Sequence, residues 1–376
     1  SFGVAPFVNK IAQVYGPRLG KELNPMKDIL VTLGANGALS SYVNAFSNSN
    51  DTVVAFEPMF PMYIDHGEFS GGKIQGIPLS LDANGIWQFD PAVLRAELSK
   101  PETKVFIMNT PHNPTGKVFT VEEMQAISDI LDDCPHVLTI SDEVYDFLTF
   151  DERTHTPFAT VGNNWNRTIS VYSGGKLMNA TGWKLGWAIG PAKLIRNGAI
   201  VANSNYYCFN TPGQVAMANS LDACFAPNYN EAGESFAQTT RTLFVQNRDS
   251  ITSAITEMAL PWKPVLVEGG YFLMADVTEC RSLIPEKYFE THDYEPEDER
   301  PPVGKNRLNM PDGRIPMDLA FCRWMAIEKG VTMMPNSFFY PNKSPTITDQ
   351  YVRLAICKDR ASTEAALDKL RNALNN

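Results

Sequence analysis

The residues with the clearest chemical potential lie in a short turn, Ser173-Gly174-Gly175-Lys176, which directly follows the apolar run Thr168–Tyr172. Small residues let a backbone turn sharply and let a ligand come close to it. A lysine held at the end of a buried strand loses proton affinity, and its amine can then act as a nucleophile in Schiff-base chemistry. The alternative is an ordinary surface lysine in a loop, and the turn alone does not decide between the two.

Other polar or glycine-containing groups follow apolar runs in the same way. Asp142 and Tyr145 come after Val137–Ile140, Asn113 lies in the segment that follows Val105–Met108, and Gly34, Ala35 and Asn36 follow Ile29–Leu33. The last group opens a helical stretch, and a glycine turn at a helix N-terminus is a natural anion site. Because ligands bind at the carboxyl ends of strands in open α/β sheets, we expect all these groups to meet in one site.

Together the groups supply an amine, a carboxylate, a phenol, an amide and a phosphate cradle. Pyridoxal 5′-phosphate (PLP) uses all five. Each residue also has an ordinary explanation: Tyr145 could pack in the core, Asp142 could cap a helix, and Ser173 could serve only the turn. We interpret the combination as a PLP site, and we predict no metal site.

The elements that must position these residues alternate between strands and helices. Short apolar runs, most of them bounded by Gly, Pro, Asn or Asp, are typical of strands buried on both faces of a parallel sheet. The runs are Ile29–Leu33, Thr52–Phe56, Val105–Met108, Val137–Ile140, Thr168–Tyr172 and Trp187–Ile189. Thr120 and Glu123 predict a capping box at the start of an intervening helix.

The pattern changes after Pro261 and predicts a smaller α+β domain. Its expected strands are Val265–Val267, Tyr271–Val277, Val331–Met334 and Tyr351–Cys357, and its expected helices are Met317–Lys329 and Ser362–Leu374. We therefore predict an α/β fold with a large domain over residues 1–255 and a small C-terminal domain over residues 256–376. A polar, proline-rich loop is expected near residues 286–316.

Composition narrows the possible partners. The 376 residues carry a net charge of -10, which argues against nucleic acid or an anionic membrane surface as the main partner. The charge-free stretches Ile29–Asn50 and Asn197–Leu221 are rich in Gly, Ser and Asn, so neither is interpreted as a membrane span. Six scattered cysteines without a CxxC pair indicate buried thiols in a reducing compartment. We expect a cytoplasmic protein, with a mitochondrial location left open because Ser1 is not an initiator Met.

Several segments resemble the fold type I PLP aminotransferases, whose large domain has a mainly parallel sheet. They are Thr110–Gly116, Ser141–Tyr145, Ser173–Trp183 and Gly182–Trp187. Glu57–Phe60, Gly269–Phe272 and Tyr351–Arg353 are similar, more narrowly, to the kynurenine aminotransferase / cysteine-S-conjugate β-lyase group. The similarity extends from Phe2 to Leu374. It also implies an N-terminal arm that would precede Ser1.

The resemblance assigns the cofactor contacts. Lys176 would bind PLP as a Schiff base and move the proton between substrate Cα and cofactor C4′. Asp142 would stay ionised and keep the pyridine nitrogen protonated. Tyr145 and Asn113 would hydrogen-bond the ring oxygen O3′, and Phe60 would stack on the ring. The phosphate would be held by the turn Gly34-Ala35-Asn36, the Ser173 hydroxyl and Lys184.

The resemblance also assigns the substrate contacts. Arg353, together with Asn113, would bind the substrate α-carboxylate, although its place between two apolar strand residues also fits a solvated face. Side-chain selectivity would come from Asn36, Tyr63 and, across a dimer interface, Tyr206 and Tyr207.

The resulting hypothesis is a homodimeric aminotransferase with shared active sites. It would move an amino group from kynurenine, glutamine, or an aromatic or sulfur amino acid to a 2-oxo acid. One alternative is β-elimination from cysteine S-conjugates, which would use the same residues. The other is a PLP-fold regulatory module without turnover.

Overall fold

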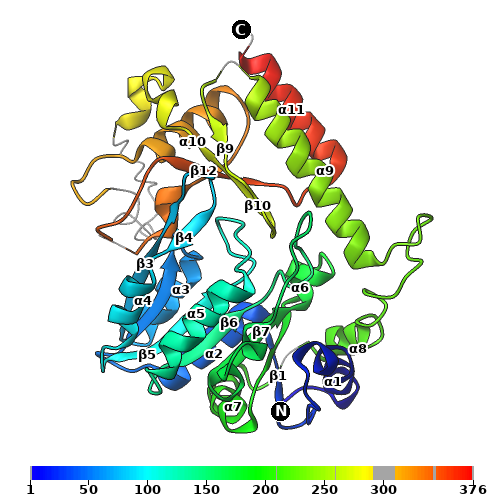
Figure 1. Ribbon diagram of the computed structural model, residues 1–376. Helices are drawn as coiled ribbons and strands as arrows, with labels where there is room; N and C mark the ends of the chain where they lie inside the picture. The colour runs from blue at the N-terminus through cyan, green and yellow to red at the C-terminus, as the bar shows by residue number, and fades with distance from the viewer. Residues whose placement is uncertain (1, 209, 259, 291–309, 342–343, 375–376) are drawn as a thin grey trace.

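An eight-stranded sheet forms the centre of the larger part of the molecule (Figure 1). The computed structural model describes residues 2–208, 210–258, 260–290, 310–341 and 344–374. The strands are β1 (Ile29–Leu33), β2 (Thr52–Glu57), β3 (Lys73–Leu81), β4 (Trp87–Phe89), β5 (Thr103–Asn109), β6 (Leu138–Asp142), β7 (Thr168–Ser173) and β8 (Leu185–Ile189). All six strands expected in this part of the chain are present.

The direction of the strands decides which residues can meet. The order across the sheet is β1-β8-β7-β6-β5-β2-β3-β4. β8 is antiparallel to both of its neighbours and β4 is antiparallel to β3, whereas the other neighbours are parallel. β1 therefore runs in the same direction as β7. The carboxyl ends of β1, β2, β5, β6 and β7 share one edge of the sheet with the amino end of β8.

Two features of this sheet differ from the sequence expectation. The run Trp187–Ile189 was expected among parallel strands, but it belongs to the antiparallel β8. The expectation also missed β3, because Gly76 and Pro78 interrupt it and both residues are unfavourable inside strands. β3 tolerates them because it lies near the edge of the sheet, beside the short β4.

Helices cover both faces of the large sheet. One face is covered by α2 (Gly34–Phe46), α3 (Pro61–Phe69) and α7 (Ala192–Tyr206). On the other face lie α4 (Pro91–Leu98) and α5 (Val121–Asp132), and, further along, α1 (Ala5–Leu19) and α8 (Thr211–Ala218). Every residue of β2 is buried, in keeping with the apolar run Val53–Phe56 at its centre. The capping box of Thr120 and Glu123 at the start of α5 is confirmed.

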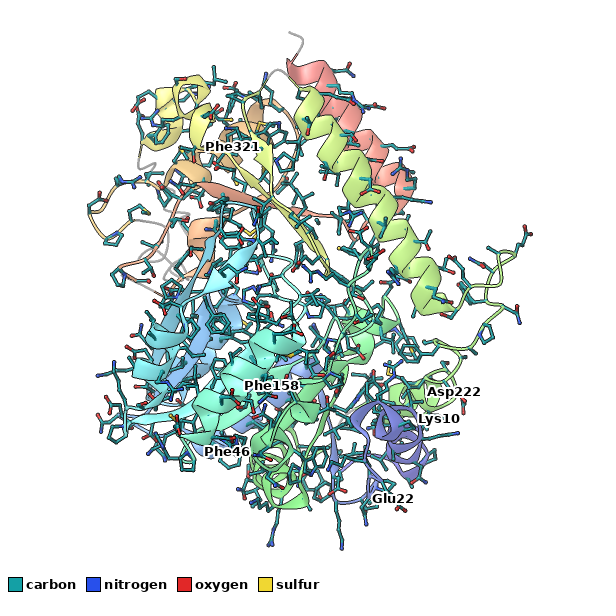
Figure 2. All side chains as sticks on the ribbon, viewed as in Figure 1. Lys10, Glu22, Phe46, Phe158, Asp222 and Phe321 are labelled. Carbon is teal, nitrogen blue, oxygen red and sulfur yellow. The ribbon has the colours of Figure 1, made fainter. Side chains whose placement is uncertain are left out.

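A surface ion pair joins α1 to the segment after α8. Lys10 of α1 forms an ion pair of 2.8 Å with Asp222, which follows α8, and Figure 2 shows the two residues next to each other at the surface.

No helix within the described residues is long and apolar enough to cross a bilayer.

A four-stranded antiparallel sheet forms the smaller part of the molecule. Its order is β11-β12-β10-β9, with β9 (Lys263–Pro264), β10 (Phe272–Asp276), β11 (Met334–Pro335) and β12 (Tyr351–Ala355). It is accompanied by α9 (Phe236–Glu257), α10 (Met317–Glu328) and α11 (Arg360–Leu374), and α9 lies beside α11 in Figure 1. The expected strand Val265–Val267 is wrong, because the short β9 ends before it.

The apolar side of α9 packs into the same core as the small sheet, with Phe244 and Ile255 in contact with the cluster around Leu273. The boundary expected between residues 255 and 256 thus falls inside this helix. Of the polar loop expected near residues 286–316, residues 291–309 lie outside the described part of the chain.

Gly186 marks a close approach between β8 and the turn that joins β1 to α2. A Cβ atom at this position would lie 2.4 Å from the amide nitrogen of Ala35 and 2.5 Å from the carbonyl carbon of Gly34. Only a residue without a side chain allows the two backbones to be this close.

We therefore expect Gly186→Ala to lower the free energy of unfolding by about 3 kcal/mol, since backbone atoms cannot yield as a flexible side chain would. The matched control is Gly182→Ala, where an added Cβ has no neighbour within 4 Å. Urea unfolding of both variants tests this, and equal stabilities would contradict the close approach.

Candidate active site

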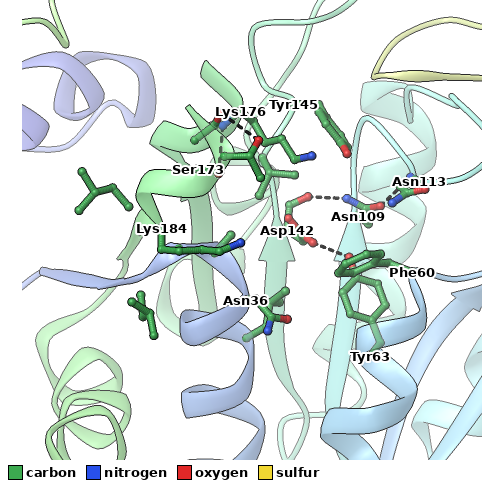
Figure 3. A pocket seen from close by; sticks show the side chains of 18 of the residues that line it. Asn36, Phe60, Tyr63, Asn109, Asn113, Asp142, Tyr145, Ser173, Lys176 and Lys184 are labelled. Carbon is green, nitrogen blue, oxygen red and sulfur yellow. Dashed lines mark hydrogen bonds between the residues drawn. The ribbon is translucent and has the colours of Figure 1, made fainter. Parts of the chain in front are cut away.

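A cavity of about 270 Å³ opens at the shared edge of the large sheet and reaches the small sheet (Figure 3). The structure brings together here every residue predicted from the sequence except Tyr206 and Tyr207. The predicted residues that line the cavity are Gly34, Ala35, Asn36, Phe60, Tyr63, Asn113, Asp142, Tyr145, Ser173, Lys176, Lys184 and Arg353. Their roles remain predictions, because position alone does not assign chemistry.

Asp142 is the last residue of β6 and lies at the floor of the cavity. Its side chain is 4% exposed, and burial raises its pKa to about 6. Tyr63 donates a hydrogen bond of 2.5 Å to Oδ2, which opposes that shift. The other oxygen, Oδ1, is buried without a hydrogen-bond partner among the described residues. A buried carboxylate oxygen of this kind is suited to a cationic or N–H ligand.

The peptide group between Asp142 and Glu143 is fixed on both sides. Asn109 Nδ2 donates to the Asp142 carbonyl oxygen at 2.9 Å, and the Glu143 amide donates to the Val171 carbonyl oxygen at 2.9 Å. Asp142 lines the cavity, whereas Glu143, the first residue after β6, does not.

The Glu143 side chain, which is fully buried, is held by several donors. Its carboxylate accepts hydrogen bonds from Ser141, Ser170, Tyr172, His155 and the Phe158 amide. These donors tie three segments of the chain to the residue next to Asp142. Sequence reasoning missed Glu143 and Asn109; their adjacency to the predicted motifs was the only available signal.

Lys176 lies in α6 (Gly174–Leu177), directly after β7. Burial lowers the pKa of its amine, and the cations Arg353 and Lys184 add to that effect while Asp142 opposes it. Nζ lies 4.7 Å from the ring centre of Tyr271 and 5.6 Å from that of Tyr145. The Tyr271 hydroxyl donates to the Lys176 carbonyl oxygen at 2.7 Å and so fixes the turn. Burial thus moves the amine toward its neutral, nucleophilic form relative to an exposed lysine.

The opposite wall is suited to an anion. α2 begins at Gly34, has no side-chain cap, and presents its first backbone N–H groups toward the cavity. Lys184 adds a positive charge, and it can do so because it directly precedes the antiparallel strand β8. Ser173 Oγ accepts from the Lys176 amide at 3.2 Å, so its hydroxyl hydrogen remains available to a second acceptor.

Arg353 of β12 forms the roof of the cavity. Its guanidinium lies 3.7 Å from the ring centre of Phe272 and 4.6 Å from that of Phe339, and burial lowers its pKa to about 10. Nη1 donates to Asn113 Oδ1 at 2.8 Å, which joins the small sheet to the loop after β5. Nε is buried without a partner among the described residues. The solvated-face alternative for Arg353 is therefore wrong.

Three predicted residues make contacts that the sequence did not suggest, and a fourth, Tyr207, is exposed. Asn36 Oδ1 lies 2.9 Å from His66 Nε2, and Tyr63 is bound to Asp142. Tyr206 donates to the Gly37 carbonyl oxygen at 2.9 Å within its own chain. Tyr207 is 82% exposed. Neither Tyr206 nor Tyr207 lines the cavity of its own chain, and a contribution to a partner's cavity stays a prediction.

Comparison with known proteins identifies the family. The profile of the family "Aminotransferase class I and II" matches residues 1–370. The chain is 31% identical over 380 residues to mouse kynurenine–oxoglutarate transaminase 1, covering 98% of this chain and 82% of that protein. It is 32% identical over 378 residues to kynurenine–oxoglutarate transaminase of Dictyostelium discoideum, covering 96% and 80%. The structure of N-succinyldiaminopimelate aminotransferase from Mycobacterium tuberculosis superposes with a TM-score of 0.80 at 28% identity, covering 99% of this chain and 84% of that one.

The chain belongs to the class I and II aminotransferases. It has the fold of the PLP-dependent fold type I enzymes, as the sequence resemblance implied, and its cofactor is PLP.

The cavity of this aminotransferase fits PLP on structural grounds. The unpartnered Oδ1 of Asp142 would meet the pyridine nitrogen, and the uncapped start of α2 with Lys184 and Ser173 would meet the phosphate. PLP supplies an aldehyde that condenses with amines and a ring that accepts electrons when a bond to substrate Cα breaks. Lys176 would hold the cofactor and move the proton at Cα, and Asp142 would hold the charge of the ring nitrogen.

The pKa of Asp142 yields a prediction about stability. Because burial raises this pKa to about 6, the folded protein holds the proton more tightly than the unfolded chain does. The carboxyl therefore stabilises the fold below about pH 4, and this contribution is lost as the pH rises through 6. In cofactor-free protein at pH 8, we expect Asp142→Asn to unfold with a free energy about 2 kcal/mol higher than the native chain.

The stability gained by Asp142→Asn should shrink toward pH 4. The catalytic rate of the PLP-loaded variant should fall by orders of magnitude. Thermal unfolding across pH, alongside an activity assay, measures both effects. A variant that is less stable at pH 8 and equally active would contradict this account of Asp142.

Proposed function

We propose that this aminotransferase accepts kynurenine, or another large uncharged amino acid such as glutamine, methionine or an aromatic residue, and passes the amino group to a 2-oxo acid. The two curated relatives named above support this choice of donor. The substrate of the structural relative differs, so the fold by itself does not select the donor.

The single observation that carries the proposal is the distribution of positive charge in the cavity. Among the described residues that line it, the Lys and Arg side chains are Lys176, Lys184 and Arg353. The first two face the expected cofactor positions, which leaves Arg353 for the substrate. One guanidinium can bind the α-carboxylate that every amino acid carries. No second cation of the lining remains for a side-chain carboxylate, so aspartate should be a poor donor.

The remaining walls favour an aromatic or long apolar side chain. Phe60, Tyr63, Tyr145 and Phe272 line the cavity. Burial against such rings stabilises a bound aromatic side chain, and the rings can meet it in offset or edge-to-face contacts. Asn36, in the first turn of α2, adds a polar group to the same cavity lining.

The alternatives have less support. β-Elimination from cysteine S-conjugates would use the same residues, but the relatives are transaminases and nothing in the cavity favours a leaving group at Cβ. A regulatory module without turnover does not need a partly buried lysine with a lowered pKa, which this cavity has.

A competition assay tests the choice of donor. Kynurenine and aspartate are supplied at equal concentration with one 2-oxo acid, and both products are quantified. We expect clear preference for kynurenine, because the aspartate side chain would lose its hydration without gaining a cation. Preference for aspartate would overturn the substrate proposal and leave the PLP chemistry intact.

The role of Arg353 generates a second prediction. Arg353→Lys removes the two-pronged donor geometry but keeps the charge, so we expect KM to rise by about tenfold or more for all donors alike. Steady-state kinetics with three donors measures this. Arg360→Lys is the matched control, because Arg360 lies in α11 outside the cavity. A rise confined to one donor would show that Arg353 contacts a side chain instead.

The proposed assembly is a homodimer with shared active sites. Exposed apolar side chains occur next to Lys184 and in or beside the helices α7 and α8: Trp183, Ile200, Tyr207 and Val215 are 50%, 58%, 82% and 44% exposed. Asn210 donates to the Trp183 carbonyl oxygen at 2.7 Å, which places the start of α8 against this segment. A second copy that covered these residues would bury them and border the cavity.

Light scattering of Ile200→Asp tests this assembly. We expect the native chain to be dimeric and Ile200→Asp to be shifted toward monomer. Phe69→Asp, at an apolar residue of α3 that is 80% exposed, should leave the dimer intact. A native monomer with full activity would contradict the proposal.

A further inference from the structure

The hydrogen bond between Tyr63 and Asp142 is among the shortest in the cavity. Tyr63 Oη lies 2.5 Å from Asp142 Oδ2, and the two side chains are joined in Figure 3. This is within the range expected for a hydroxyl that donates to an ionised carboxylate. Tyr63 is 1% exposed, so water does not compete for the bond.

The backbone around Tyr63 explains how it reaches Asp142. Phe60 directly precedes α3, and the Tyr63 amide donates to the Phe60 carbonyl oxygen at 2.9 Å. The two rings meet edge to face, with centres 5.6 Å apart and an interplanar angle of 84°. Phe60 and Tyr63 are therefore one helical turn apart: Phe60 supplies the predicted stacking ring, and Tyr63 supplies the hydrogen-bond donor to the Asp142 carboxylate.

This geometry differs from the substrate contact expected from the sequence. A tyrosine hydroxyl has one hydrogen to donate, and here Asp142 receives it. The bond occupies Oδ2 and leaves Oδ1 as the unpartnered oxygen. Tyr63 thereby selects which oxygen of Asp142 is available to a ligand.

We propose that Tyr63 is a positioning residue for the PLP reaction: it orients the Asp142 carboxylate and keeps it ionised for the cofactor ring. The inference rests on the proposed function, since Asp142 must serve the ring nitrogen. It assigns the hydroxyl of Tyr63 no direct part in donor selection, while the ring remains part of the cavity wall.

The groups around Asp142 determine in which direction its pKa moves when the Tyr63 hydroxyl is removed. Burial is the largest influence and raises its pKa, and the charge of Glu143, which directly follows β6, acts in the same direction. Tyr63 from α3, the backbone amide of Val144 and Lys176 from α6 lower it. Tyr145, from the loop after β6, also faces the carboxyl. Without the Tyr63 hydroxyl, the pKa of Asp142 should move above about 6 and into the neutral range.

The test compares Tyr63→Phe with Tyr42→Phe. Tyr42 is also fully buried in the same core, but its hydroxyl lies 3.5 Å from the Ile195 carbonyl oxygen and does not contact Asp142. Hydrogen bonds to charged groups correspond to about a tenfold change or more in equilibrium. We expect Tyr63→Phe to weaken PLP binding by about that factor and to move the acidic limb of kcat/KM upward by about one pH unit.

The loss should be equal for kynurenine, methionine and glutamine, and Tyr42→Phe should show none of these changes. Tyr63→Phe should add little in an Asp142→Asn background, because the two residues act through one interaction. A donor-specific rise in KM with an unmoved pH profile and native PLP affinity would overturn the proposal and restore the substrate contact.

A readout without cofactor separates this inference from the proposed function. In cofactor-free protein, the Asp142 carboxyl carbon can be titrated by NMR, and its midpoint should rise in Tyr63→Phe whether or not the protein is an active transaminase. If Tyr63→Phe does not fold, a fluorotyrosine at this position keeps the ring shape and donates more strongly, so the midpoint should fall instead. An unmoved midpoint in the folded variant would contradict the proposal.

Discussion

The burial of one carboxylate, that of Asp142, is the constraint on which the cavity depends. An ionised group in this position is unfavourable unless donors surround it. The protein provides Tyr63 on one oxygen and fixes the backbone on both sides through Asn109 and Val171. The next residue, the fully buried Glu143, accepts hydrogen bonds from β7 and from residues 155–158. These bonds fix the chain directly after Asp142.

The antiparallel direction of β8 is as important for the opposite side of the cavity as the burial of Asp142 is for its own side. A purely parallel sheet would bring only carboxyl ends to this edge, but the antiparallel β8 adds its amino end and with it Lys184. Gly186 lets β8 approach the β1–α2 turn closely enough to complete the anion cradle. The small sheet is joined to the loop after β5, at the cavity, by the hydrogen bond between Arg353 and Asn113.

The sequence was sufficient for the fold class and for most of the cavity, because buried parallel strands leave continuous apolar runs and place their functional residues directly after them. It was insufficient where a contact depends on distant segments. Glu143 and Asn109 act through hydrogen bonds that no local pattern encodes. Tyr63 was expected at the substrate, but its partner is 79 residues away. β3 was missed because Gly76 and Pro78 interrupt its apolar run, and the antiparallel direction of β8 was not predicted because apolar runs do not encode direction.

The account centres on Lys176 as the residue that holds PLP, and the cavity contains a second lysine, Lys184, that could compete for this role. Borohydride reduction of the PLP-loaded protein fixes an imine as a stable secondary amine, and peptide mapping then locates it. The account predicts loss of the visible absorbance band and a single pyridoxyl adduct on Lys176. An adduct on Lys184, or PLP that is released without any adduct, would contradict it.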